Sequence, residues 1–272
     1  MTSSRIYIDP EFRQVVETHL AGNLVVAPTG SPLILGIFGP PGEGKTYQVD
    51  RICGEYGLAT TTISPGELES ENAGHPGQLL RKEYLKVGSS GRNGVLIVHD
   101  IDTVLGNWGS LVQYTVNRQV VFGQMMALCD YPTMVAGTSC QRVPIVMTGN
   151  NPAILYGPLL RPGRTRMYGW KPSTATRVPI VAGIFPELAT DQIARFLDLY
   201  PDRPVSFWAD VRAAVWEEAM ARWIVRDGRS SLRAMIQSGQ KMSPSPEVFS
   251  HDSIAAAAIK LDATDIRESS FV

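Results

Sequence analysis

The sequence predicts a doubly wound α/β fold, in which helices cover both faces of a parallel five-stranded sheet, followed by a small helical subdomain. Short β-type runs alternate with helical segments, and several of these runs are apolar throughout, as strands buried on both faces of a parallel sheet are. The predicted strands cover residues 33–38, 59–63, 95–98, 144–148 and 166–170. The predicted helices between them cover residues 46–56, 77–87 and 110–129.

The sequence changes character after Trp170, where Lys171 and Pro172 interrupt the alternation. We expect helices at residues 190–199 and 205–225, and a weaker one at 253–261. The second of these carries apolar residues at every fourth position, which predicts core packing. They are Phe207, Val211, Val215, Ala219 and Trp223. The predicted organisation is an α/β subdomain over residues 1–172, then a helical subdomain and C-terminal tail over 173–272.

The composition is that of a globular protein with nearly balanced charge. The 272 residues include 25 Lys and Arg against 26 Asp and Glu, and this balance disfavours binding to nucleic acid through overall charge. The three cysteines have no metal-type spacing, which is typical of a reducing compartment. No apolar run approaches the roughly 18 residues that a membrane span requires. We therefore expect a cytoplasmic protein without nucleic-acid or membrane partners.

The most specific motif is a phosphate-binding loop between the first predicted strand and the helix after it. It matches G-x-x-x-x-G-K-[ST] with the residues Gly39, Pro40, Pro41, Gly42, Glu43, Gly44, Lys45 and Thr46. Glycines let backbone amides curl around phosphates, Lys45 reaches the β- and γ-phosphates, and Thr46 binds Mg²⁺. The motif and its position predict a site for ATP and Mg²⁺.

A second motif, His99-Asp100-Ile101-Asp102, directly follows the apolar strand at 95–98. Such a strand delivers its carboxylates to the edge of the sheet beside the phosphates. Asp100 stands where an acid polarises the attacking water, and it is also a candidate magnesium ligand. In ordinary ATPases with such a loop and strand, the position of His99 holds an Asp that supports Mg²⁺. Because Mg²⁺ prefers oxygen ligands, we interpret His99 as a hydrogen-bonding residue at the strand end. Asp102 either caps the next helix or takes part in the chemistry.

Two further elements follow in chain order. Asn150, after the strand at 144–148, would orient water near the γ-phosphate, or it belongs to a simple Gly-Asn-Asn-Pro turn. Arg161 and Arg164 flank a Pro-Gly turn. They would present a guanidinium to the phosphate of a neighbouring subunit, or they lie in a solvated loop.

These four elements, in this order, resemble AAA+ ATPases, and the local sequence resembles Rubisco activases of the green type. The resemblance is carried by segments at 64–74, 113–119, 148–161 and 205–223. It implies an ATP-driven hexameric ring that frees inhibitory sugar phosphates from Rubisco. The match begins almost at Met1, so we expect the AAA+ module without the N-terminal domain of that family.

The resemblance also implies residue roles. Lys45 and Thr46 would bind nucleotide and magnesium, Asp100 would support hydrolysis, and Asn150 would be the first sensor. The arginines at 161 and 164 would act across a subunit interface, and the second sensor, in the lid, would be Arg212. Segments 67–74 and 106–109 would line the pore, with the candidate side chains Glu67, Glu69, Asn72 and Trp108.

Two alternatives to this function remain open at the level of sequence. One is an AAA+ remodeller of another protein client. The other is a nucleotide-gated scaffold that binds ATP and assembles but turns over slowly, and the imidazole of His99 motivates it.

Overall fold

The structure is a computed structural model that describes residues 7–26, 30–68, 75–102, 112–242 and 245–269, with backbone alone for 112–117, 227–230 and 265–269. The described residues form two compact units. One comprises Ile8–Lys171, and the other runs from Pro172 toward the C-terminus and includes Tyr7. No helix in these ranges is both long and apolar enough to span a membrane.

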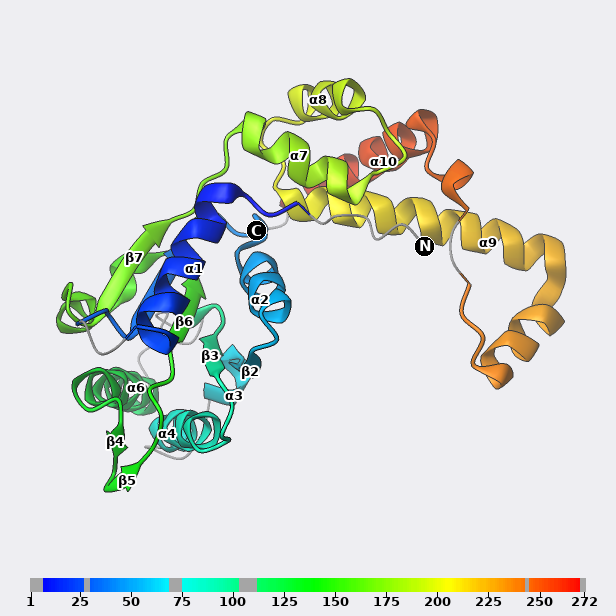
Figure 1. The fold of residues 1–272 in the computed structure, drawn as a ribbon. Helices are drawn as coiled ribbons and strands as arrows, with labels where there is room; N and C mark the ends of the chain where they lie inside the picture. The colour runs from blue at the N-terminus through cyan, green and yellow to red at the C-terminus, as the bar shows by residue number, and fades with distance from the viewer. Residues whose placement is uncertain (1–6, 27–29, 69–74, 103–111, 243–244, 270–272) are drawn as a thin grey trace. The chain divides into compact units, whose positions relative to one another are not determined.

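The first unit is built on a parallel sheet of five strands (Figure 1). Its strands are β1 (Ile34–Phe38), β2 (Ala59–Ile63), β3 (Gly94–Val98), β6 (Ile145–Gly149) and β7 (Thr165–Gly169). The order is β2-β3-β6-β1-β7, with every neighbouring pair parallel. The three inner strands are fully buried, whereas the edge strands β2 and β7 are partly exposed. The predicted five-stranded sheet is confirmed, with every strand within one residue of its expected bounds.

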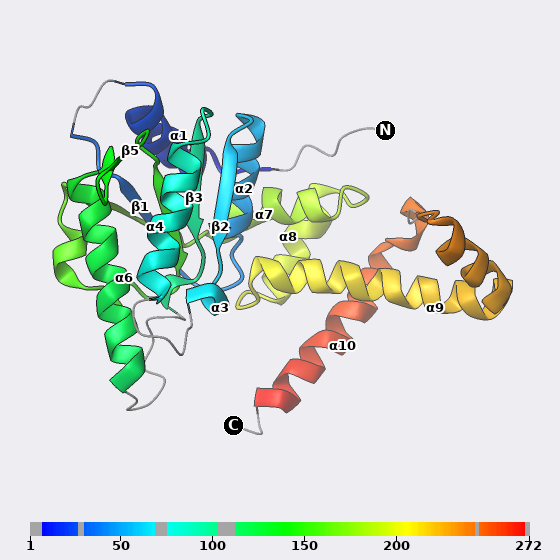
Figure 2. The ribbon, with the colours of Figure 1, turned by 90° about the horizontal axis from the view of Figure 1, so that it is seen from below.

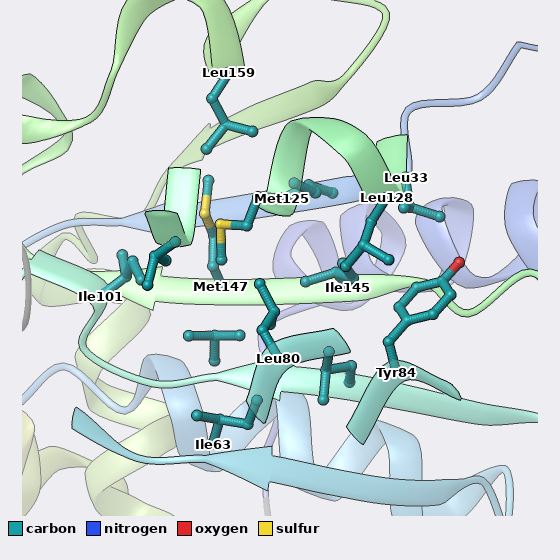
Figure 3. Packing of buried hydrophobic residues seen from close by; sticks show 14 of the residues in the cluster. Leu33, Ile63, Leu80, Tyr84, Ile101, Met125, Leu128, Ile145, Met147 and Leu159 are labelled. Atoms are coloured by element: carbon teal, nitrogen blue, oxygen red, sulfur yellow. The ribbon is translucent and has the colours of Figure 1, made fainter. Parts of the chain in front are cut away.

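Alternate side chains of the inner strands enter two different apolar layers. The layer containing Ile145 and Met147 also takes apolar residues of α4 (His75–Gly88) and α6 (Val112–Asp130), including Leu80 and Met125. Figure 3 shows these side chains converging on the strand that carries Ile145. The two helices pack on each other (Figure 2). Because strand side chains alternate between faces, the other buried side chains of these strands point the opposite way.

Helix α1 (Pro10–Leu24), which packs on α2 (Lys45–Glu55), has no counterpart in the sequence-based prediction. Its signals were present in the sequence: Asp9 accepts hydrogen bonds from the backbone of Glu11 and Phe12, each at 2.9 Å, and Pro10 occupies the first turn. The short helix α3 (Pro65–Leu68) and the hairpin of β4 (Met134–Val135) and β5 (Thr138–Ser139) were also missed.

The second unit is helical, as predicted. It contains α7 (Thr174–Ile184), α8 (Thr190–Leu199), α9 (Val205–Ser238), the short 3-10 helix η3 (Pro246–Val248) and α10 (His251–Ser269). Phe207, Val211 and Val215 lie in its core, so the predicted packing role of the helical stripe is confirmed there. Helix α9 continues to Ser238, beyond the predicted end at residue 225, and α7 was not predicted.

Candidate nucleotide-binding site

The phosphate-binding loop joins β1 to α2, and its backbone requires glycine at several positions. Gly42 and Gly44 have φ values of 71° and 73°, a region that L side chains rarely adopt. At Gly39 an added Cβ would lie 1.7 Å from the carbonyl oxygen of Trp170, so no larger residue fits. These constraints give the loop its tight curl at the start of α2.

Lys45 is the buried cation of this loop, and its ammonium is held by three oxygens. Nζ donates to the carbonyls of Gly39 and Pro40 at 2.9 and 2.8 Å and to Oδ1 of Asn150 at 3.0 Å. Burial lowers the pKa of Lys45, whereas the nearby carboxylates, Asp100 first among them, oppose that shift. The structure therefore brings together the loop lysine and the predicted sensor.

Thr148 connects the loop to the strand that carries the predicted catalytic acid. Its hydroxyl lies 3.3 Å from that of Thr46 and accepts the backbone N–H of Asp100 at 3.3 Å. Thr148 is fully buried, and Asp100 has a φ of 41°, which is unusual for a residue with a side chain. Sequence reasoning gave Thr148 no role, although a threonine in an otherwise apolar strand was a signal.

Asp102 holds the turn that carries Asn150. Its Oδ2 accepts the backbone N–H groups of Asn150 and Asn151 at 2.8 and 3.0 Å. An added Cβ at Gly149 would lie 2.8 Å from its Oδ1, so the glycine lets the carboxylate approach. The expected roles of Asp102 were to cap the helix that follows it or to take part in the chemistry. Its carboxylate does accept backbone N–H groups, as a cap does, but these N–H groups belong to the turn after β6.

His99 is half-buried at the end of β3. Its backbone N–H donates to the carbonyl of Ile63 at 3.0 Å, which continues the pairing of β2 with β3. Its ring Nδ1 is buried and has no hydrogen-bond partner among the described residues, so the expected ring hydrogen bond is not seen at this nitrogen. Burial lowers the pKa of His99, against the charges of Asp50 and Asp100, which favours the neutral imidazole.

The two candidate finger arginines differ in their surroundings. Arg164 makes a bidentate ion pair with Asp130, at 3.0 and 2.8 Å, and donates to the carbonyl of Pro158 at 3.0 Å. Arg161 is exposed and follows the 3-10 helix η2 (Gly157–Leu160). Arg164 is therefore engaged within its own chain, whereas Arg161 is presented to solvent.

The second-sensor candidate, Arg212, lies on α9 in the helical unit. Its two terminal nitrogens each donate to Glu187 at 2.8 Å, and its guanidinium lies 3.7 Å from the centre of the Phe249 ring. Burial alone would raise the pKa of Glu187, but the hydrogen bonds from Arg212 hold it below its ordinary value.

Of the pore candidates, the structure describes Glu67 alone. Its Oε2 accepts hydrogen bonds from the backbone and hydroxyl of Ser64 at 2.8 and 2.7 Å, and these lower the pKa of Glu67. Glu69, Asn72 and Trp108 lie outside the described residues.

The donor set fits a magnesium nucleotide. The described residues contain no cluster of three or more His, Cys, Asp or Glu side chains that could hold a metal by itself. Mg²⁺ is commonly bound through one or two protein oxygens together with substrate phosphates. The hydroxyl of Thr46 and the carboxylate of Asp100 can supply those oxygens, beside the ammonium of Lys45.

Comparison with known proteins identifies the family of the chain. Residues 35–172 match the model of the ATPase family associated with various cellular activities (AAA). The ribulose bisphosphate carboxylase/oxygenase activase of Chlamydomonas reinhardtii is 35% identical over 254 residues, which cover 89% of this chain and 62% of the relative. The activase of Anabaena sp. is 36% identical over 235 residues, covering 82% and 57%. The chain thus spans about three-fifths of the length of these relatives.

The residues that match the family model contain the phosphate-binding loop and all of the parallel sheet except Ile34. The resemblance to Rubisco activases is confirmed at the level of sequence identity. With its fold and loop geometry, the chain belongs to the AAA family of ATPases.

Proposed function

We propose that this ATPase is a protein-remodelling chaperone of the Rubisco activase type, which releases inhibitory sugar phosphates from the active sites of Rubisco. The observation that carries the proposal is the similarity to Rubisco activases over 89% of the chain. Lys45 donates a hydrogen bond to Asn150 and interacts electrostatically with Asp100, and this proximity of the three residues supports the ATP-driven part of the proposal.

In this proposal each residue has a distinct task in the attack of water on the γ-phosphate. The loop amides and Lys45 hold the phosphates, and Asp100 accepts the proton of the attacking water. Asn150 turns its Oδ1 to Lys45, so its amide nitrogen is the atom that can donate to a phosphate or to water. When bound, Mg²⁺ would neutralise phosphate charge, held by Thr46 and Asp100.

We further propose a cytoplasmic homo-hexameric ring, in which residues 1–172 bind nucleotide and residues 173–272 form the lid and tail. Arg161 acts on the phosphate of the next subunit, and Arg164 supports the same turn from within its own chain. Arg212 is the second sensor. The exposed position of Arg161 and the ion pair of Arg164 with Asp130 favour this division of labour.

The proposal is tested by the release of inhibited Rubisco. Rubisco carrying a tightly bound inhibitory sugar phosphate is mixed with the protein, ATP and Mg²⁺, and recovery of carboxylase activity is followed. We expect recovery with the wild-type chain and none with Lys45→Ala. Active ATP hydrolysis without recovery would contradict Rubisco as the client and favour a remodeller of another protein.

A second candidate is a nucleotide-gated scaffold with slow turnover, and the neutral, half-buried His99 favours it. The two are separated by the steady-state ATPase rate measured against the number of nucleotides bound per ring. Full occupancy with negligible turnover supports the scaffold. Turnover that is stimulated by the client supports the motor.

A further inference from the structure

Trp170 is the next-to-last residue of the first unit, and it forms one hydrogen bond just before the phosphate-binding loop and one within it. Its backbone N–H donates to the carbonyl of Phe38 at 2.7 Å, just before the loop begins. Its indole N–H donates to the backbone carbonyl of Glu43 at 2.7 Å. The second hydrogen bond is buried and joins residues 127 positions apart in the chain.

The hydrogen bond to Glu43 determines the direction of a phosphate-binding amide. In a planar trans peptide, the C=O and the N–H point in opposite directions. With the carbonyl of Glu43 directed at the indole, the N–H of Gly44 must point the other way, away from Trp170. Gly44 has φ 73° and is the N-cap of α2, where backbone amides bind anions.

The indole is itself held firmly. It is 4% exposed, and its ring packs edge-on against Phe12 of α1, with the centroids 5.1 Å apart and the planes at 80°. The start of α1 is tied to α2, because the backbone of Asp9 donates to Oε1 of Gln48 at 3.1 Å. The indole is therefore anchored by a contact with Phe12, which lies outside the loop.

We propose that Trp170 is a positioning residue of the nucleotide site, which keeps the Glu43–Gly44 peptide turned so that the Gly44 amide can bind a phosphate. This rests on nucleotide binding at the loop, as the proposed function requires. Without the indole N–H, the buried carbonyl of Glu43 loses this donor, and the peptide can rotate toward the interior of the loop. A phosphate must then turn the peptide back before the Gly44 amide can bind it, and this cost lowers the affinity for phosphate.

The test compares two changes that remove the donor with one control. Trp170→Phe removes the N–H and part of the ring. Incorporation of 3-benzothienylalanine at position 170 replaces only the N–H by sulfur and keeps the ring size. The control is Trp208→Phe, because Trp208 is equally buried, in the second unit, and its indole nitrogen has no hydrogen-bond partner among the described residues.

Binding of ATP and of inorganic tripolyphosphate is measured by calorimetry with Mg²⁺ present. We expect both changes at position 170 to weaken the binding of both probes by about tenfold, which corresponds to the loss of one buried hydrogen bond, and we expect the control to bind normally. A thermal melt shows whether Trp170→Phe is folded. If it is not, the test relies on the protein that carries 3-benzothienylalanine at position 170.

Unchanged affinity of the folded benzothienyl chain would overturn the inference while leaving the proposed function intact. A loss for ATP but not for tripolyphosphate would also overturn it, because the residue would then act on the nucleoside. If the wild-type chain binds neither probe, the proposed function fails, and the inference fails with it.

Discussion

The ammonium nitrogen of Lys45 lies 3.0 Å from Oδ1 of Asn150, a residue 105 positions away in the chain. The other two hydrogen bonds of this ammonium go to loop carbonyls, so all three donors of the lysine are used. In the proposed function, a phosphate that enters the loop would replace these oxygens as partner of Lys45, and Asn150 would lose its contact with the ammonium. This contact joins the phosphate-binding loop to the end of β6, where the proposed sensor lies.

Lys45→Ala is expected to abolish tight ATP binding. The substitution removes a charge that would make strong hydrogen bonds to the β- and γ-phosphates, each contributing about 1.5–3 kcal/mol. We expect affinity to fall by about a hundredfold or more, as measured by calorimetry. An unchanged affinity would remove Lys45 from the site.

Asp100→Asn is expected to preserve ATP binding while slowing hydrolysis by about 10²–10⁴-fold. The amide cannot accept the proton of the attacking water, yet every phosphate donor stays in place. Binding and turnover are measured on the same preparation. If turnover survives, the catalytic carboxylate lies elsewhere, and Asp102→Asn becomes the next variant to assay.

Thr148→Val is expected to lower both stability and ATPase activity, whereas Thr148→Ser retains most of both. Valine has nearly the same shape but leaves the N–H of Asp100 without its acceptor and removes the partner of the Thr46 hydroxyl. The expected loss in the free energy of unfolding is about 1–3 kcal/mol, measured by denaturant titration. Equal behaviour of the two variants would show that the hydroxyl is not needed.

Arg161→Ala and Arg164→Ala are expected to fail in different ways. Arg161→Ala should bind ATP and melt normally but hydrolyse slowly, with a loss of about 10³–10⁵-fold if it is the finger. Arg164→Ala should lower the melting temperature as well, because it breaks the bidentate pair with Asp130. Thermal melts and ATPase assays of both variants decide this.

Rings that mix Arg161→Ala with Asp100→Asn subunits test action between subunits. Some interfaces in such rings pair an intact acid with an intact arginine, so part of the ATPase activity should return. Mixed rings of verified composition that stay inactive would contradict catalysis by Arg161 in trans.

The buried His19 is expected to make stability depend on pH. Burial lowers its pKa to about 4, below the ordinary value of 6.5, so the unfolded chain binds the proton more readily than the folded one. The contribution of His19 to stability is therefore complete above pH 6.5 and is lost as the pH falls from 6.5 to 4. Between these two pH values, His19 is expected to change the free energy of unfolding by about 1.4 kcal/mol per pH unit. His19→Gln should remove this pH dependence of the free energy of unfolding, as measured by denaturant titrations at several pH values. The same pH dependence in the wild-type and variant proteins would contradict the prediction.

The amino-acid sequence by itself determined the sheet, the phosphate-binding loop and the family. Each of these depends on neighbours in the chain: apolar runs predict buried strands, and the glycines and Lys45 of the loop lie within eight residues. The start of α1 is also marked locally, by the N-cap Asp9 and by Pro10 in the first turn.

Tertiary structure alone decided which side chains meet. Thr46 and Thr148 are 102 positions apart, Trp170 and Glu43 are 127 apart, and Arg164 finds Asp130 across 34 residues. No local pattern encodes such pairs, because they form only when the crossovers of the parallel fold bring distant segments together. The same physics separated Arg161 from Arg164, which look equivalent in sequence: one guanidinium has a carboxylate of its own chain within reach, and the other extends into solvent.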